Sequence, residues 1–165
     1  MHSTADHLST REDLVWRAFF ETQVLFWRRL GQQLQHDTGL SEPDFAILSA
    51  LAQAPEQRLR AFELSGVTQF EKSRLHHHLN RMIGRGLLTR EQCPGASRGT
   101  VIALSPEGLT AITTALPIRA AHIRQWLTDP LNDGQIDSLT EISETLLENL
   151  RAADAPPATP PIDCA

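Results

Sequence analysis

One stretch of the sequence, residues 71–104, constrains the fold more than any other, because a helical pattern is followed directly by two short strand patterns. In segment 71–85 apolar residues recur at steps of three and four, and Gly84-Arg85-Gly86 ends the helix. Segments 87–92 and 100–104 are the only convincing strands, and the Gly- and Pro-containing run between them predicts a β-hairpin with a long tip. The sequence therefore predicts a mainly α fold with one small β-hairpin.

Helical patterns flank this stretch on both sides. The further predicted helices lie at about 10–38, 42–55, 61–67, 106–128 and 133–151. Thr10 with Asp13 resembles a capping box at the start of the first helix, and Gly39 ends it. Residues 1–9 and the Pro-rich tail 152–165 have almost nothing to bury, so both are predicted to be disordered.

Two short helices, a sharp turn, a longer polar and basic helix and a hairpin, in this order, are typical of a winged helix-turn-helix. We assign this DNA-binding domain to residues 39–105. The helices at 10–38 and 106–151 carry more apolar surface than one small domain can cover. We therefore expect them to form a helical dimerisation region that packs against a second copy of the chain, giving a homodimer.

The charge of the chain is unevenly distributed. The net charge is −5, but residues 56–104 hold eight basic and four acidic side chains, for a local charge of +4. The segments on either side are acidic, at −3 for residues 1–55 and −6 for residues 105–165. A basic centre between acidic flanks favours contact with phosphate groups at one surface only.

The candidate DNA-contacting residues lie on the helix at 71–85, whose apolar stripe of Leu75, Leu79, Met82 and Ile83 must face the core. The side chains left for other faces are Lys72, Ser73, Arg74, His77, His78 and Arg81. Arg74 and His77 lie near the N-terminal end, where groove-binding helices contact bases. Lys72, Ser73 and Arg81 suit contacts to the phosphate backbone.

These residues also carry a family resemblance. EKSRLHHHLNRMIGRGLLTRE resembles the recognition helix and first wing strand of MarR-type regulators, and CPGASRGTVIALSPEG resembles their wing. Upstream, GLSEPDFAILSAL is similar to the helix that precedes them, so that the resemblance covers about residues 10–151. It implies a homodimeric, sequence-specific repressor that binds a pseudo-palindromic operator and is released by a small-molecule effector.

The resemblance also assigns residues beyond the helix. Arg98 matches a wing-tip arginine that enters the minor groove, although Ala96 replaces the Asp that usually holds that arginine in place. Effector pockets in such proteins lie between the dimerisation region and the winged domain. The candidate pocket residues are Trp16, Phe20, Phe45 and Ile112.

Other functions fit the sequence less well. His76, His77 and His78 point about 100° apart on a helix, so they cannot converge on one metal ion, and no cofactor is implied. Glycine-rich phosphate loops, zinc-protease motifs and nucleophile elbows are absent from the sequence, so it is not predicted to be an enzyme. A winged-helix protein-interaction module and a redox sensor using Cys93 remain as alternatives. Without a membrane-length apolar run or a signal peptide, the expected compartment is the cytoplasm.

Overall fold

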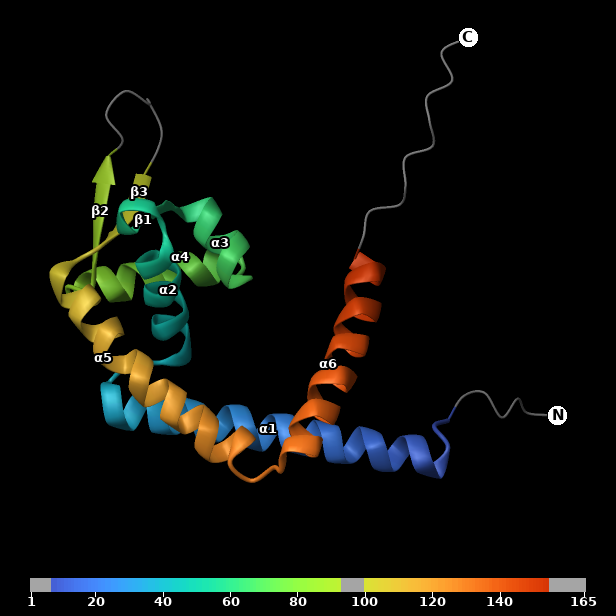
Figure 1. Cartoon of the computed structure of the whole chain (residues 1–165). Coiled ribbons are helices and arrows are strands. Elements are labelled where there is room, and N and C mark those ends of the chain that lie inside the picture. Colours follow the sequence, from blue (N-terminus) through green and yellow to red (C-terminus); the bar gives the residue numbers. More distant parts are fainter. Residues whose placement is uncertain (1–6, 93–99, 155–165) are drawn as a thin grey trace, which may run out of the picture. The chain divides into compact units, whose positions relative to one another are not determined.

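The computed structural model describes residues 7–92 and 100–154 of the chain. Its α-helices are α1 (Thr10–Thr38), α2 (Glu42–Gln53), α3 (Ala61–Thr68), α4 (Lys72–Gly84), α5 (Pro106–Ile123) and α6 (Asp133–Asp154). Its strands are β1 (Arg58–Arg60), β2 (Leu88–Gln92) and β3 (Thr100–Leu104). The architecture is mainly helical with one small antiparallel sheet, which confirms the predicted fold class (Figure 1).

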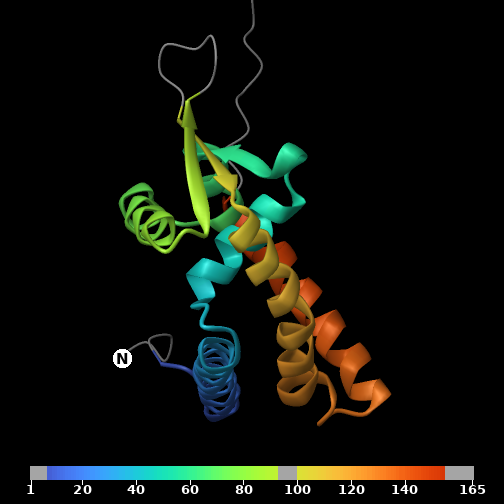
Figure 2. The same ribbon diagram turned by 90° about the vertical axis from the view of Figure 1, so that its left-hand side faces the viewer.

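The chain divides into two compact units, one ending at Ile123 and one beginning at Arg124. In the first unit, α5 packs against both α1 and α2, and α3 packs against α4. Helix α4 lies beside β2 (Figure 2). The second unit contains a π-helical turn at Arg124–Thr128 and then α6. The predicted helix at 106–128 is therefore α-helical only as far as Ile123.

The ends of α1 and α2 are set by local hydrogen bonds. Ser9 caps α1, with its Oγ accepting from the Glu12 N–H while the Glu12 carboxylate accepts from the Ser9 N–H. The predicted capping box at Thr10 and Asp13 was thus wrong by one residue. Gly39 ends the helix in the left-handed conformation (φ 71°), where a side chain would be strained.

The sheet has three strands instead of the two that the sequence predicts. Its order is β1-β3-β2, and both pairings are antiparallel. Leu59 in β1 and Arg90 in β2 both pair with Ile102, so β3 is the central strand. Strand β1 contains only three residues, Arg-Leu-Arg, which is too short for an alternating pattern to be recognised in the sequence.

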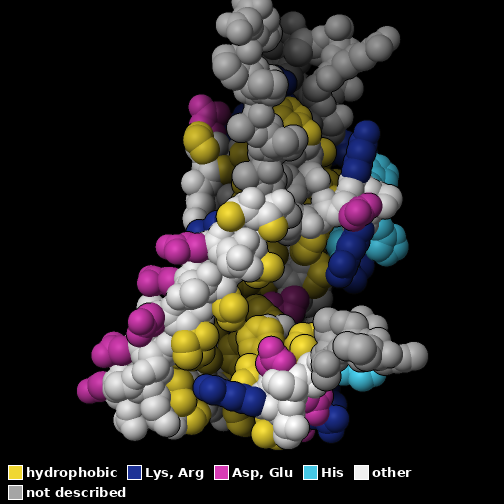
Figure 3. All heavy atoms as spheres, turned by 90° about the vertical axis from the view of Figure 1, so that its right-hand side faces the viewer, with side chains coloured by type: hydrophobic (Ala, Val, Ile, Leu, Met, Phe, Trp, Pro, Cys, Tyr) yellow, Lys and Arg dark blue, Asp and Glu magenta, His cyan; other side chains and the backbone are white. Residues whose placement is uncertain are grey.

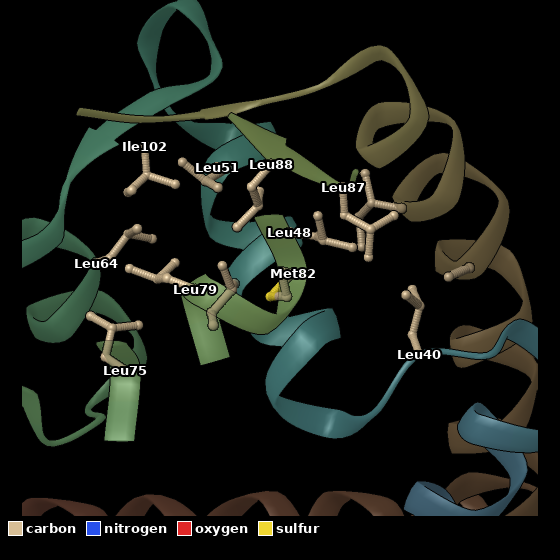
Figure 4. Close-up of a cluster of buried hydrophobic side chains, with 13 residues drawn as sticks. Leu40, Leu48, Leu51, Leu64, Leu75, Leu79, Met82, Leu87, Leu88 and Ile102 are labelled. Atoms are coloured by element: carbon tan, nitrogen blue, oxygen red, sulfur yellow. The ribbon is translucent and has the colours of Figure 1, made fainter. Parts of the chain in front are cut away.

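A single hydrophobic core joins the helix-turn-helix to the sheet and to α5 (Figure 4). Its fully buried side chains include Leu48, Leu51, Leu64, Leu75, Met82, Leu88, Ile102 and Ile112. In α3 only Leu64 is buried, whereas Phe62 and Val67 remain exposed. The face of α4 that contributes to this core is the one predicted from its apolar spacing.

The junction between β2, β3 and α5 is packed closely around Ser105. The buried Ser105 hydroxyl donates to the Gly86 carbonyl oxygen (2.7 Å) and accepts from the Gly108 N–H (2.9 Å). The Ser105 N–H donates to the Leu87 carbonyl oxygen (3.2 Å). A Cβ atom added to Gly108 would overlap that carbonyl oxygen, so this position accepts only glycine without a backbone shift.

Helix α6 is amphipathic along its whole length. Exposed apolar side chains occupy one side of it, namely Leu139, Ile142, Leu146, Leu147 and Leu150. Acidic side chains follow the opposite edge, as the magenta and yellow rows in Figure 3 show. Among the described residues, no helix combines the length and the apolar character needed to cross a membrane.

Candidate nucleic-acid interface

Helix α4 presents a polar face to solvent while its other face is fixed in the core. The side chains of Leu75, Leu79 and Met82 are buried. Ser73, His77 and Asn80 are exposed and recur at steps of four and three, so they share the face opposite that stripe. Lysine, arginine and histidine side chains gather on the exposed side of this region (dark blue and cyan in Figure 3). This face can donate and accept hydrogen bonds along two helical turns.

Arg74 lies beside this face, and its guanidinium group contacts an aromatic ring. Its guanidinium carbon lies 5.4 Å from the centre of the Phe70 ring, which is within the range of a cation–π contact. Arg74 itself is exposed. The contact restricts the arginine without burying its charge, so the guanidinium stays accessible to a base edge or phosphate.

His78 is placed differently from His77, although the sequence offers both as candidates. Its ring is half-buried, 5.8 Å from the Phe70 ring, and its Nδ1 is buried with no hydrogen-bond partner among the described residues. Burial, with smaller contributions from Arg81 and Arg74, lowers the pKa of His78 below its ordinary value. A neutral, half-buried imidazole is less suited to contact DNA than the exposed His77, and its DNA contact stays a prediction.

Arg81 and Arg85 hold α4 against the start of α2 through one buried carboxylate. Arg81 Nη2 lies 2.6 Å from Asp44 Oδ1, and Arg85 Nη1 lies 2.7 Å from Asp44 Oδ2. Asp44 is only 1% exposed, whereas the two arginine side chains are 43% and 39% exposed. The sequence predicts a phosphate contact for Arg81 and gives no sign that Asp44 is its partner. The geometry gives Arg81 a structural contact, and its contact with phosphate stays a prediction.

The pKa of Asp44 reflects this arrangement. Burial alone would raise the pKa, but hydrogen bonds from the Ser41 backbone, from Arg81 and from Arg85 outweigh burial and hold it below its ordinary value. Ser41 also caps α2, because its Oγ accepts from the Asp44 N–H (3.3 Å). The carboxylate therefore stays ionised at neutral pH and pairs with both arginines.

Asn80 also lies on the exposed face of α4, although it is not among the candidate residues predicted from the sequence. Its side-chain oxygen accepts from Arg90 Nη2 of β2 at 2.8 Å, and its side-chain nitrogen lies 2.9 Å from His76 Nε2. The signal that could have found it is its spacing, since Asn80 is seven residues beyond Ser73 and therefore two turns along the same face.

The predicted wing tip falls outside the described residues. Arg98, Ala96 and Cys93 all belong to the segment 93–99, so the minor-groove contact and the redox alternative stay predictions from the sequence. At the base of the wing, the described strands β2 and β3 pair in register from Leu88–Leu104 to Gln92–Thr100.

The four predicted pocket residues are not brought together. Ile112 is fully buried in the core, and Phe45 is half-buried on α2, where Arg119 lies 5.7 Å from its ring centre. Phe45 lines a shallow groove with Leu59 and Val67, among others. Trp16 and Phe20 contact each other on an exposed face of α1, 5.5 Å between ring centres. An effector contact at any of the four stays a prediction.

Two further polar contacts, an ion pair and a hydrogen bond, join α5 to the α1–α2 junction. Arg119 is buried and donates to both oxygens of Glu42, at 2.7 and 2.9 Å. The buried His122 ring has its Nε2 2.8 Å from Asp37 Oδ2. Contacts with His36 and His122 hold the pKa of Asp37 below its ordinary value. Within the described residues, no three His, Cys, Asp or Glu side chains are grouped so that they could hold a metal ion.

A winged helix whose second helix exposes polar and basic side chains defines a class of DNA-binding proteins. Comparison with known proteins identifies the family within this class. The model of the MarR family matches residues 38–99. Among curated proteins, the transcriptional regulator HosA of Escherichia coli O111:H- is 29% identical over 102 residues, which are 62% of this chain and 74% of that protein.

Two solved structures extend the similarity over almost the whole chain. Sco3205, a MarR family transcriptional regulator from Streptomyces coelicolor in complex with DNA, is 35% identical with a TM-score of 0.78, covering 87% of this chain and 94% of that one. AbsC, a MarR family transcriptional regulator from the same organism, is 30% identical with a TM-score of 0.80, covering 90% and 99%. The chain belongs to the MarR family and is a DNA-binding transcriptional regulator, not an enzyme.

Proposed function

We propose that the protein is a homodimeric repressor that binds a pseudo-palindromic operator and is released from it by a small-molecule effector. The observation that carries this proposal is the outward face of α4, where polar side chains lie on a helix whose opposite face is fixed in the core. In a two-fold dimer this face occurs twice. The two copies of α4 would then enter successive major grooves about one helical turn (~34 Å) apart.

The exposed apolar faces of α1 and α6 support a second copy of the chain as the partner. On α1 the exposed apolar side chains that share one face include Trp16, Phe19, Phe20 and Trp27. On α6 they include Ile142 and Leu146. Exposed apolar surfaces of this kind are uncommon on monomeric proteins. In a two-fold dimer the same surface of each subunit is used, so the apolar faces of one chain would be covered by those of the other.

Replacing Ile142 and Leu146 together with glutamate should therefore convert the dimer to monomer, because four charges would enter one interface. Sedimentation equilibrium should show the monomer mass, and footprinting should show protection of one half-site at most. The matched control is the double change of Glu144 and Glu148 to lysine, which alters charge at two exposed positions on the opposite side of α6. A double variant that keeps the dimer mass and the full footprint would refute the proposed interface.

Arg74 and Lys72 should separate sequence preference from general affinity. Arg74→Ala should cost about 1–3 kcal/mol on the preferred site and relax base preference, since the proposed contact to a base edge would be lost. Lys72→Ala should weaken binding to all sequences alike and lower the slope of log affinity against log salt by about one. Titrations of both variants against preferred and scrambled duplexes measure this, and equal losses on every duplex would contradict the assignment.

The proposed effector acts by favouring a form of the dimer in which the two α4 helices do not match the operator. Its influence on DNA affinity can be no larger than the difference between its affinities for the two forms. A compound that raises the unfolding temperature of the full chain and also releases it from operator DNA would identify the effector class. If no compound that binds the chain alters its DNA affinity, the repressor acts without an effector.

A further inference from the structure

Asn80 lies on the outward face of α4 and has a partner on each side. Arg90, from β2, donates to its side-chain oxygen at 2.8 Å, and His76, one turn earlier on α4, lies 2.9 Å from its side-chain nitrogen. We propose that Asn80 determines base specificity by contacting adenine in the major groove, and that Arg90 and His76 are positioning residues for its side chain. This inference rests on the proposed function and deepens it.

The orientation of the Asn80 amide follows from the chemistry of its neighbours. A guanidinium group has only donors, so the atom that faces Arg90 must be the amide oxygen. The amide NH₂ then faces His76, whose Nε2 must accept the hydrogen bond. Rotating the amide by 180° would place the NH₂ group against the guanidinium, where two donors would face each other and the Arg90 hydrogen bond would be lost. One orientation is therefore fixed by the Arg90 contact alone.

The groups that remain on Asn80 match one base. Its oxygen has two lone pairs and its nitrogen two hydrogens, and one of each is used by Arg90 and His76. One acceptor and one donor are left. In the major groove adenine offers the complementary pair, the N6 donor and the N7 acceptor, whereas guanine offers two acceptors. Asn80 is therefore suited to adenine and unsuited to guanine.

The link to β2 also explains how this contact would be precise. Asn80 is exposed, and an exposed side chain ordinarily loses rotamer freedom when it binds. Here the amide is already held between a strand and a helix turn, so less freedom remains to be lost. Because Asn80 is two turns beyond Ser73, the bases contacted at the two ends of this face should be about two base pairs apart.

Selection of bound duplexes from a randomised pool by the full-length protein tests this inference. The wild-type chain should require an A·T pair at one position of each half-site. Asn80→Ala should lose that requirement alone and bind the selected site about 10-fold more weakly, within the range of one bidentate contact. Its thermal unfolding should match the wild type, because the side chain is on the surface.

Variants of β2 test the positioning role of Arg90. Arg90→Ala should weaken the preference at the same base pair and at no other, and Arg90→Lys, which keeps a donor, should restore part of it. The matched control is Thr89→Ala, an exposed neighbour on the same strand, which should keep every preference.

The outcomes separate this inference from the proposed function. If the wild-type chain selects no sequence, both fail. If it selects an operator and Asn80→Ala retains every base preference, then DNA binding stands and the role of Asn80 is refuted. If Arg90→Ala retains the full adenine preference while Asn80→Ala loses it, Asn80 contacts the base without help from β2.

Discussion

Replacing Gly108 with alanine is expected to lower the free energy of unfolding by about 3 kcal/mol or more, at the upper end of the effects of overpacking. The added Cβ would overlap the carbonyl oxygen of Leu87, which already accepts the Ser105 N–H. Neither the Leu87 carbonyl nor the backbone at residue 108 can move easily, because both belong to the buried junction of β2, β3 and α5. The variant should also lose DNA affinity, because a shift of this junction moves the strands at the base of the wing.

The control for this variant is expected to raise the free energy of unfolding instead of lowering it. Gly66 lies within α3, is exposed, and has nothing within 4 Å of the position of an added Cβ. Alanine is the better helix former, so Gly66→Ala should raise stability by about 0.5–1 kcal/mol. Urea unfolding followed by circular dichroism at one protein concentration compares the two. Equal stability of both variants would show that the junction near Gly108 adapts to a side chain.

Asp44→Ala is expected to lower the free energy of unfolding by about 3 kcal/mol, the lower end of the range for breaking a buried ion pair. The lower end applies because Arg81 and Arg85 are partly exposed and can turn to water once the carboxylate is gone. The matched control is Asp13→Ala, which removes a surface ion pair with Arg17 and should change stability by less than about 0.5 kcal/mol. A loss no larger than that of the control would mean that the Asp44 cluster does not stabilise the fold.

The same carboxylate predicts an acid-sensitive component of stability. Its pKa in the folded chain is below the ordinary value of 3.8, so its contribution is fully present above that value. This contribution is lost as the pH falls through the lower pKa of Asp44 in the folded chain. The reason is that the unfolded chain binds the proton more tightly than the folded chain does. Urea titrations between pH 6 and pH 3 should show a steeper loss of stability in the wild type than in Asp44→Ala, and parallel curves would contradict this.

Much of the architecture follows from local sequence pattern. The apolar spacing of Leu75, Leu79 and Met82 correctly identified the buried face of α4, and Gly39 marked the end of α1, because both signals depend on neighbouring residues only. Strand β1 was missed because three residues carry no period. It forms only through pairing with β3, more than forty residues away in the sequence.

The site was harder to predict than the fold, because its geometry depends on contacts between distant segments. Spacing alone places Arg81 on an exposed side of α4. The residues near it in the sequence do not show that its guanidinium group pairs with Asp44, which is 37 residues earlier. His77 and His78 are adjacent and chemically identical, yet the Phe70 ring covers one and leaves the other exposed. The role of Asn80 likewise depends on Arg90, which comes from another element.

Glu42 and Asp44 belong to the same first turn of α2, and they bind α5 and α4 respectively. With the contact between His122 and Asp37, these pairs connect four elements, namely the end of α1, α2, α4 and α5. Elements that are connected in this way are expected to move together. In the proposed dimer, a change in the distance between the two α4 helices would then be expected to arise outside these connected elements, and the π-helical turn that begins directly after Ile123 is an irregular stretch of backbone at which the chain could bend.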